Sequence, residues 1–238
     1  MNNNWAERTA IITGGAAGLG LATAQRLQQK GVRVALFDAR QDALSKARQQ
    51  LGEEVLTHVV DVTNESDVAM AVDQVFAVWG RIDILINSAG ITGQTNFARV
   101  MAVNVHGIMH TFKAVAPHML AREFGRVLNV ASVAGKDGNA GMASYSASKA
   151  AVIGLTKSQG KEYAQTGISI NAIAPAVVRT EIVAALPPQQ VDYMTAKIPM
   201  GRCGTVEEFA TLAEYVVSAE NSFTTGFCFD LTGGRSVY

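Results

Sequence analysis

At 238 residues, the chain is long enough for one α/β domain with a substantial core, and we expect a single domain over residues 1–238. Apolar residues make up 48% of it and charged residues 17%, and its 20 Lys and Arg balance its 20 Asp and Glu. This composition is typical of a globular protein and lacks the basic excess that a nucleic-acid partner usually requires.

Short apolar runs rich in β-branched residues alternate along the chain with longer segments of helical periodicity. The predicted strands are Thr9–Thr13, Val32–Phe37, Val55–Val60, Ile82–Asn87, Gly125–Ser132, Ile168–Ala174 and Phe227–Leu231. The predicted helices are Leu19–Lys30, Asp42–Leu51, Glu65–Trp79, Ala98–Arg122, Ala143–Gln165 and Val206–Ala219. Right-handed crossovers between such elements predict an α/β fold: a single-domain, Rossmann-type, doubly wound parallel sheet of about seven strands with helices on both faces.

The five prolines lie mostly between Pro175 and Pro199. Because proline interrupts helices and strands, this region is predicted to contain a loop or lid, which we place near residues 176–204.

The first predicted strand runs directly into the glycine-rich turn Thr13–Gly20, and a helical pattern begins at once. Glycines let backbone N–H groups approach a pyrophosphate, and the helix N-terminus adds a partial positive charge. The turn therefore predicts a dinucleotide phosphate site, although a plain tight turn into a helix has a similar sequence.

Asp38 follows the second predicted strand, about twenty residues beyond the turn, where a carboxylate accepts hydrogen bonds from ribose hydroxyls. This position favours NAD, because a 2′-phosphate would meet a like charge and Gly15–Ala17 offers it no cation. Arg40 is a nearby cation that works against this preference. A polar strand end or a helix cap is the alternative for Asp38, and for Asp61 a helix cap is as well supported as an adenine contact.

Tyr145 and Lys149 are four residues apart in a predicted helix, so their side chains project from one face. A neighbouring ammonium favours the phenolate, and we expect Lys149 to lower the pKa of Tyr145 toward that of a useful base. Ser132 ends a predicted strand, where open α/β sheets bind ligands, and its hydroxyl is suited to hold the substrate oxygen. Taken alone, the Tyr–Lys pair is more typical of a solvated helix face than of a catalytic site.

Together these motifs resemble those of the short-chain dehydrogenase/reductase family along the whole chain. The family's TGxxxGxG appears as Thr13–Gly20, its NNAG as Asn87–Gly90, its asparagine as Asn104, its serine as Ser132 and its YxxxK as Tyr145–Lys149. The resemblance implies a catalytic tetrad of Asn104, Ser132, Tyr145 and Lys149, in which Tyr145 is the acid/base and Asn104 holds a proton-passing water.

The resemblance also implies the residues that contact NAD. They are Gly14, Ala17, Gly18, Leu19, Gly20, Asp38, Asp61, Val62, Asn87, Ala89, Gly90, Tyr145, Lys149, Pro175, Val178 and Thr180. Ser88 stands where the family has its second asparagine, and Ala176 stands where it has a glycine. The stretch from Ile91 to Val103 is shorter than in the family, so the resemblance does not predict the rim of the pocket.

His106 and His110 have the spacing of a helical metal pair, but no third ligand accompanies them and we expect no metal. In the family this segment forms a subunit interface, which implies a homotetramer. The strand before Gly234 resembles one that packs near a neighbouring subunit and leads to Arg235 and Tyr238, although a plain core strand is as well supported.

No apolar run approaches the length of a membrane span, and the chain begins without a secretory pattern, so we expect a cytoplasmic protein with no membrane partner. The two cysteines, Cys203 and Cys228, have no metal or disulfide spacing and are expected to be packing residues.

These observations predict an NAD-dependent oxidoreductase that interconverts a secondary alcohol and a ketone on a small-molecule substrate. The resemblance is closest to dehydrogenases of sugars or sugar acids, including 2-keto-3-deoxy sugar acids, and Ser132, Tyr145 and Arg179 are the expected substrate contacts. Arg179 would pair with a carboxylate, although a solvent-facing arginine is slightly better supported. The alternatives are a 3-oxoacyl carrier-protein reductase and, less well supported, a dinucleotide-binding protein without catalysis.

Overall fold

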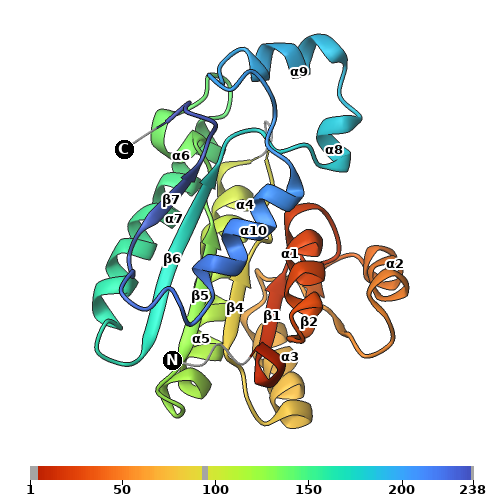
Figure 1. Ribbon diagram of the computed structural model, residues 1–238, viewed down its shortest axis with the longest axis vertical. Helices are drawn as coiled ribbons and strands as arrows, with labels where there is room; N and C mark the ends of the chain where they lie inside the picture. The colour runs from red at the N-terminus through yellow and green to blue at the C-terminus, as the bar shows by residue number, and fades with distance from the viewer. Residues whose placement is uncertain (1–4, 93–95, 237–238) are drawn as a thin grey trace.

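The computed structural model describes residues 5–92 and 96–236, so Tyr238 lies outside the described residues. One parallel sheet of seven strands forms the centre, in the order β3-β2-β1-β4-β5-β6-β7. The strands are β1 Thr9–Thr13, β2 Arg33–Asp38, β3 Leu56–Val59, β4 Ile84–Asn87, β5 Gly125–Val130, β6 Ile168–Pro175 and β7 Cys228–Leu231. The predicted doubly wound sheet is thereby confirmed (Figure 1).

Helices cover both faces of the sheet (Figure 1). One face carries α1 (Gly18–Gln29), α2 (Gln41–Leu51) and α10 (Val206–Val216). The other carries α3 (Glu65–Trp79), α5 (Gly107–Leu120) and α7 (Ala143–Glu162). The central strands are mostly apolar because both faces of the sheet are covered, as β1 shows: Ile11 packs in one layer and Ile12 in the other.

The order of the strands reverses direction at β1, which pairs with β2 on one side and with β4 on the other. In open α/β sheets, ligands bind outside the carboxyl ends of the strands at such a switch point. Thr13 and Asn87, the last residues of β1 and β4, are partners in register. The fold therefore brings the glycine turn and the Asn87–Gly90 segment to one edge.

The segment predicted as one helix, Ala98–Arg122, is interrupted in the structure. It consists of α4 (Phe97–Met101), a π-helical turn η2 (Ala102–His106) and α5. Periodicity does not reveal this break, because a π turn adds one residue without changing the apolar character of the segment. Asn104 lies within the π turn, and such turns recur at functional sites.

Four short helical elements are additional to the predicted ones. A 3-10 turn, η1 (Trp5–Glu7), precedes β1, and α6 (Ala134–Asp137) follows Ser132. Within the predicted lid, α8 (Glu181–Ala184) and α9 (Pro188–Thr195) are short helices and not a loop alone. Among the helices that the structure describes, none is both long and apolar enough to cross a membrane.

Candidate active site

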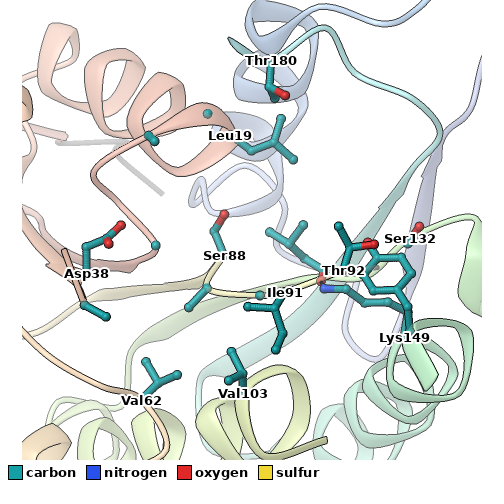
Figure 2. A pocket seen from close by; sticks show the side chains of 18 of the residues that line it. Leu19, Asp38, Val62, Ser88, Ile91, Thr92, Val103, Ser132, Lys149 and Thr180 are labelled. Atoms are coloured by element: carbon teal, nitrogen blue, oxygen red, sulfur yellow. Dashed lines mark hydrogen bonds between the residues drawn. The ribbon is translucent and has the colours of Figure 1, made fainter. Parts of the chain in front are cut away.

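A cavity of about 650 Å³ opens at the carboxyl ends of the central strands. In Figure 2, Asp38 lies at one end of it and Ser132 with Lys149 at the other. Fourteen of the sixteen expected NAD contacts line this cavity; they are Gly14, Ala17, Gly18, Leu19, Asp38, Asp61, Val62, Ala89, Gly90, Tyr145, Lys149, Pro175, Val178 and Thr180. Ser132, expected to contact the substrate, lines it as well.

The glycine turn is held close to the segment after β4. Gly14 adopts φ +61°, and a Cβ there would lie 2.8 Å from the Ala89 nitrogen, so only glycine fits. Thr13 Oγ1 accepts hydrogen bonds at 3.2 Å from the backbone N–H groups of Ser88 and Ala89, which ties the two segments together. Ser88 in place of asparagine leaves these backbone bonds intact.

The N-terminus of α1 faces the cavity through Gly18 and Leu19. Its N-cap residue, Ala17, makes no side-chain capping bond, so no side chain at that position competes for the first N–H groups of the helix. These features fit a pyrophosphate, which requires backbone donors and a helix N-terminus. Gly20 is buried in the helix against Gly14 and permits this packing without lining the cavity.

Asp38 is 8% exposed at the end of β2 and lines the cavity. Both carboxylate oxygens bind Arg40: Nε donates to Oδ1 at 3.1 Å and Nη2 to Oδ2 at 3.3 Å. This pairing raises the pKa of Arg40. Arg40 also lines the cavity, so the acid expected to favour NAD is partly neutralised by a cation that the sequence placed beside it.

Asp61 and Val62 line the same end of the cavity. Asp61 Oδ1 accepts from the backbone N–H and the hydroxyl of Thr63, which lowers the pKa of Asp61. The helix that follows is capped by Asn64, so Asp61 is not its cap. A Cβ on Gly107 would lie 2.6 Å from Val62 Cγ2, so this glycine lets α5 pack against the Val62 segment.

Ser132 and Tyr145 face the cavity and are hydrogen-bonded to each other. The pKa of Tyr145 is raised by burial, and the hydrogen bond from Ser132 opposes the rise. Burial therefore moves the pKa of Tyr145 in the direction opposite to that expected from Lys149, whose Nζ lies 5.7 Å from the ring centroid.

Lys149 lies on α7, and its side chain reaches the end of β5. The residue is only 5% exposed. Its Nζ donates to the Val130 carbonyl at 2.6 Å, and burial lowers its pKa to about 8. A Cβ on Gly135 would lie 2.5 Å from the Lys149 carbonyl carbon. Gly135 therefore lets α6 approach α7 at the turn that carries the lysine.

Asn104 and Asn87 are buried beneath the cavity and do not line it. Asn104 Oδ1 accepts from Ile91 N at 2.8 Å, and its Nδ2 donates to Ile91 O and Ser148 Oγ. The side chain thus fixes the Ile91 backbone at the rim, and its role with a water stays a prediction. Asn87 donates to Asn129 Oδ1 and accepts from Thr111, which cross-links β4, β5 and α5.

The structure does not bring Arg179 to the cavity. Its backbone N–H donates to Gly204 O at 2.8 Å, its side chain is exposed, and its neighbours Val178 and Thr180 line the cavity instead. The alternation of side chains along this extended segment explains why Arg179 points outward.

Several cavity residues were not singled out from the sequence. Apart from Arg40, Ser88 and Ala176, the additional lining residues are Phe37, Ala39, Val60, Ile91, Thr92, Arg99, Val103, Val130, Ala131 and Glu181. Most of them lie next to the predicted end of a strand. The ends of β2, β3 and β5 had led to the prediction of nearby site residues, and the same signal could have identified these. Arg99 and Glu181 had no such signal, because neither follows a strand: Arg99 lies near the start of the predicted helix Ala98–Arg122, and Glu181 begins α8, which was not predicted.

His110 Nδ1 donates to the Val62 carbonyl at 2.9 Å, and the His106 and His110 rings lie edge to face with centroids 6.5 Å apart. Within residues 5–92 and 96–236, no group of three or more His, Cys, Asp or Glu side chains is arranged to hold a metal ion.

Comparisons with known proteins match nearly the whole chain. A family model described as short chain dehydrogenase matches residues 8–191. The chain is 46% identical to the 2-dehydro-3-deoxy-L-rhamnonate dehydrogenase (NAD(+)) of Sphingomonas sp. strain SKA58, over 98% of this chain and 97% of that protein. It is 36% identical to a 3-oxoacyl-[acyl-carrier-protein] reductase of Thermotoga maritima, over 95% of this chain and 97% of that protein.

Among solved structures, NAD+-bound xylitol dehydrogenase is similar with a TM-score of 0.91 and 32% sequence identity, covering 98% of this chain and 100% of that one. The resemblance expected from the motifs is thereby confirmed.

Proposed function

The chain belongs to the short chain dehydrogenase family, and we propose that it uses NAD to interconvert a secondary alcohol and a ketone on a sugar acid of the 2-keto-3-deoxy class. The observation that carries this proposal is that one cavity joins Asp38 to Ser132, Tyr145 and Lys149. The 46% identity to a dehydrogenase named for such a substrate supports the substrate class.

The cavity residues fit NAD. The uncapped N-terminus of α1 suits the pyrophosphate, and Asp38 suits the hydroxyls of the adenosine ribose. Val62 and Asp61 would adjoin the adenine, while Lys149 and the backbone near Val178 would hold the nicotinamide half. Bound in this way, NAD would supply the acceptor or donor of a hydride at the substrate carbon.

The protein's own part in the reaction is to hold and move a proton. Ser132 donates a hydrogen bond to the substrate oxygen, and Tyr145 takes the hydroxyl proton during oxidation or returns it during reduction. With a pKa of about 8, Lys149 is still mostly protonated at neutral pH. Its charge, 5.7 Å from the centroid of the Tyr145 ring, would favour the phenolate.

A 3-oxoacyl carrier-protein reductase is the second candidate, because 36% identity links the chain to such an enzyme. Asp38 at the ribose end disfavours the phosphorylated cofactor that these reductases usually use. A dinucleotide-binding protein without catalysis is least favoured, because Ser132, Tyr145 and Lys149 are all present and share one cavity.

We further propose a single catalytic domain whose residues 176–204 act as a substrate lid, assembled as a homotetramer in the cytoplasm. Exposed apolar side chains on two faces support assembly: Met109 and Leu120 on α5, and Phe223 and Phe227 near β7. Light scattering on the purified protein would give four copies per particle, and a monomer at micromolar concentration would contradict the assembly.

The proposed function is tested by mixing protein and NAD with a panel of sugar acids, polyols and hydroxy acids and recording NADH absorbance. We expect turnover with 2-keto-3-deoxy sugar acids well above that with neutral polyols. Reduction of 3-oxoacyl thioesters as the fastest reaction would favour the second candidate.

A further inference from the structure

An ion pair lies at the end of the cavity that is remote from Ser132. Asp38 and Arg40 both line the cavity, and Arg40 Nε lies 3.1 Å from Asp38 Oδ1. The two side chains differ in exposure, which is 8% for Asp38 and 57% for Arg40. A buried anion at the end of β2 is therefore paired with a cation that lies largely in solvent.

The hydrogen bonds from Arg40 use most of the capacity of Asp38 to accept. An ionised carboxylate offers about four acceptor positions. Arg40 fills three of them: its backbone N–H and its Nε each donate to Oδ1 at 3.1 Å, and its Nη2 donates to Oδ2 at 3.3 Å. The two hydroxyls of an adenosine ribose each require an acceptor, so Asp38 cannot bind both while the guanidinium is in place.

The guanidinium of Arg40 can leave Asp38 without breaking other hydrogen bonds. Arg40 is the N-cap residue of α2, and its carbonyl accepts from Leu44 N at 3.1 Å, so its backbone is held by the helix. Its side chain makes no capping bond. Within residues 5–92 and 96–236, Asp38 is the only group to which the guanidinium donates. Because an ion pair with one partner in solvent contributes little to stability, rotation of the side chain costs little.

We propose that Arg40 is a specificity-determining residue, which competes with the ribose hydroxyls for Asp38 and thereby limits the preference for NAD over NADP. The inference rests on the proposed function, because the competition requires NAD to bind with its adenosine ribose at Asp38. When the guanidinium turns away, the carboxylate regains two acceptor positions for the hydroxyls. With NADP, the same cation offsets the repulsion between Asp38 and the 2′-phosphate. Arg40 thus weakens the binding of NAD and strengthens that of NADP.

The test measures cofactor binding and needs no substrate. Titrations with NADH and with NADPH, followed by cofactor fluorescence, give the Kd of each for the wild-type protein and for Arg40→Met. We expect Kd for NADH to fall about two- to fivefold in Arg40→Met, the change that corresponds to a largely exposed ion pair. Kd for NADPH should rise, because its 2′-phosphate then meets Asp38 alone, and the ratio of Kd for NADPH to Kd for NADH should increase at least about tenfold.

Two further variants show whether the effect passes through Asp38. In the Asp38→Ser background, Arg40→Met should leave Kd for NADH unchanged within about twofold, because no carboxylate remains to be released. Arg48→Met is the matched control, because Arg48 lies on the same helix, pairs with Glu53 and does not line the cavity. It removes the same charge and should keep the wild-type ratio of the two Kd values. Thermal unfolding reports whether each variant keeps its fold.

Weaker binding of NADH by Arg40→Met would mean that Arg40 orients Asp38 for the ribose, and it would overturn the competition. An unchanged ratio of the two Kd values, or an equal change in Arg48→Met, would also overturn it. A wild-type protein that binds NADPH more tightly than NADH would contradict the use of NAD instead, and the direction of the shift in Arg40→Met would still decide the role of Arg40.

Discussion

Burial of the Lys149 ammonium lowers the free energy of unfolding, and replacement of Lys149 with methionine should remove this destabilisation. A fall in its pKa from 10.5 to about 8 corresponds to about 3 kcal/mol against the folded state when the amine is charged. Losing the bond from Nζ to the Val130 carbonyl costs about 1 kcal/mol in return. We therefore expect Lys149→Met to be about 2 kcal/mol more stable than wild type at pH 7 and to lose nearly all turnover.

The sign of the pH dependence follows from the direction of the shift. Because the folded pKa lies below the unfolded one, the unfolded chain binds more protons between about pH 8 and 10.5, and the wild-type protein gains stability across that window. The advantage of Lys149→Met is thus full below pH 8 and disappears toward pH 10.5.

Urea unfolding of both proteins without cofactor, at pH 7 and pH 10, measures this difference. Lys157→Met is the matched control, since Lys157 is exposed on the same helix and its replacement should change stability by less than about 0.5 kcal/mol. A Lys149→Met protein that is less stable than wild type at pH 7, or a difference that does not vary with pH, would refute the reasoning.

Four further outcomes are expected. Tyr145→Phe should bind NADH normally and lose about 10²- to 10⁴-fold in turnover, and near-normal turnover would remove Tyr145 from the mechanism. The oxidative rate should rise with pH and then level, because Tyr145 must be deprotonated and burial raises its pKa; a flat rate from mildly acidic to alkaline pH, with chemistry limiting, would contradict this. Asp38→Ser should narrow the preference for NAD over NADP in binding titrations, and a wild-type preference for NADP would contradict that role. Gly135→Ala should cost about 1–3 kcal/mol in urea unfolding and lower turnover, because its Cβ would lie 2.5 Å from the Lys149 backbone; unchanged stability would contradict this contact.

Much of the fold followed from local patterns. Strand β1 matches its predicted bounds because Thr9–Thr13 is a β-rich run that ends at a glycine turn. Most of the cofactor site could be predicted from the ends of the strands. Side chains just beyond parallel strands meet at one edge of the sheet, and the cavity lies there.

What the sequence did not reveal depends on packing between distant segments. The π turn at Asn104 is fixed by bonds to Ile91 and Ser148, and neither contact is visible in a periodic pattern. The pKa of Tyr145 is raised by burial, which the spacing of Tyr145 and Lys149 in the sequence does not reveal. The outward direction of Arg179 follows from the pairing of its segment with Gly204, so its charge alone could not locate the substrate carboxylate.

We propose above all that the protein uses the groups lining this cavity to oxidise the secondary alcohol of a sugar acid with NAD. This proposal is tested most directly by the ratio of kcat/KM for 2-dehydro-3-deoxy-L-rhamnonate with NAD to that for a 3-oxoacyl thioester with NADPH. We predict a ratio well above one, and a kcat/KM for the sugar acid that falls with the loss of acid/base catalysis in Tyr145→Phe. A ratio below one in the wild-type protein would contradict the account.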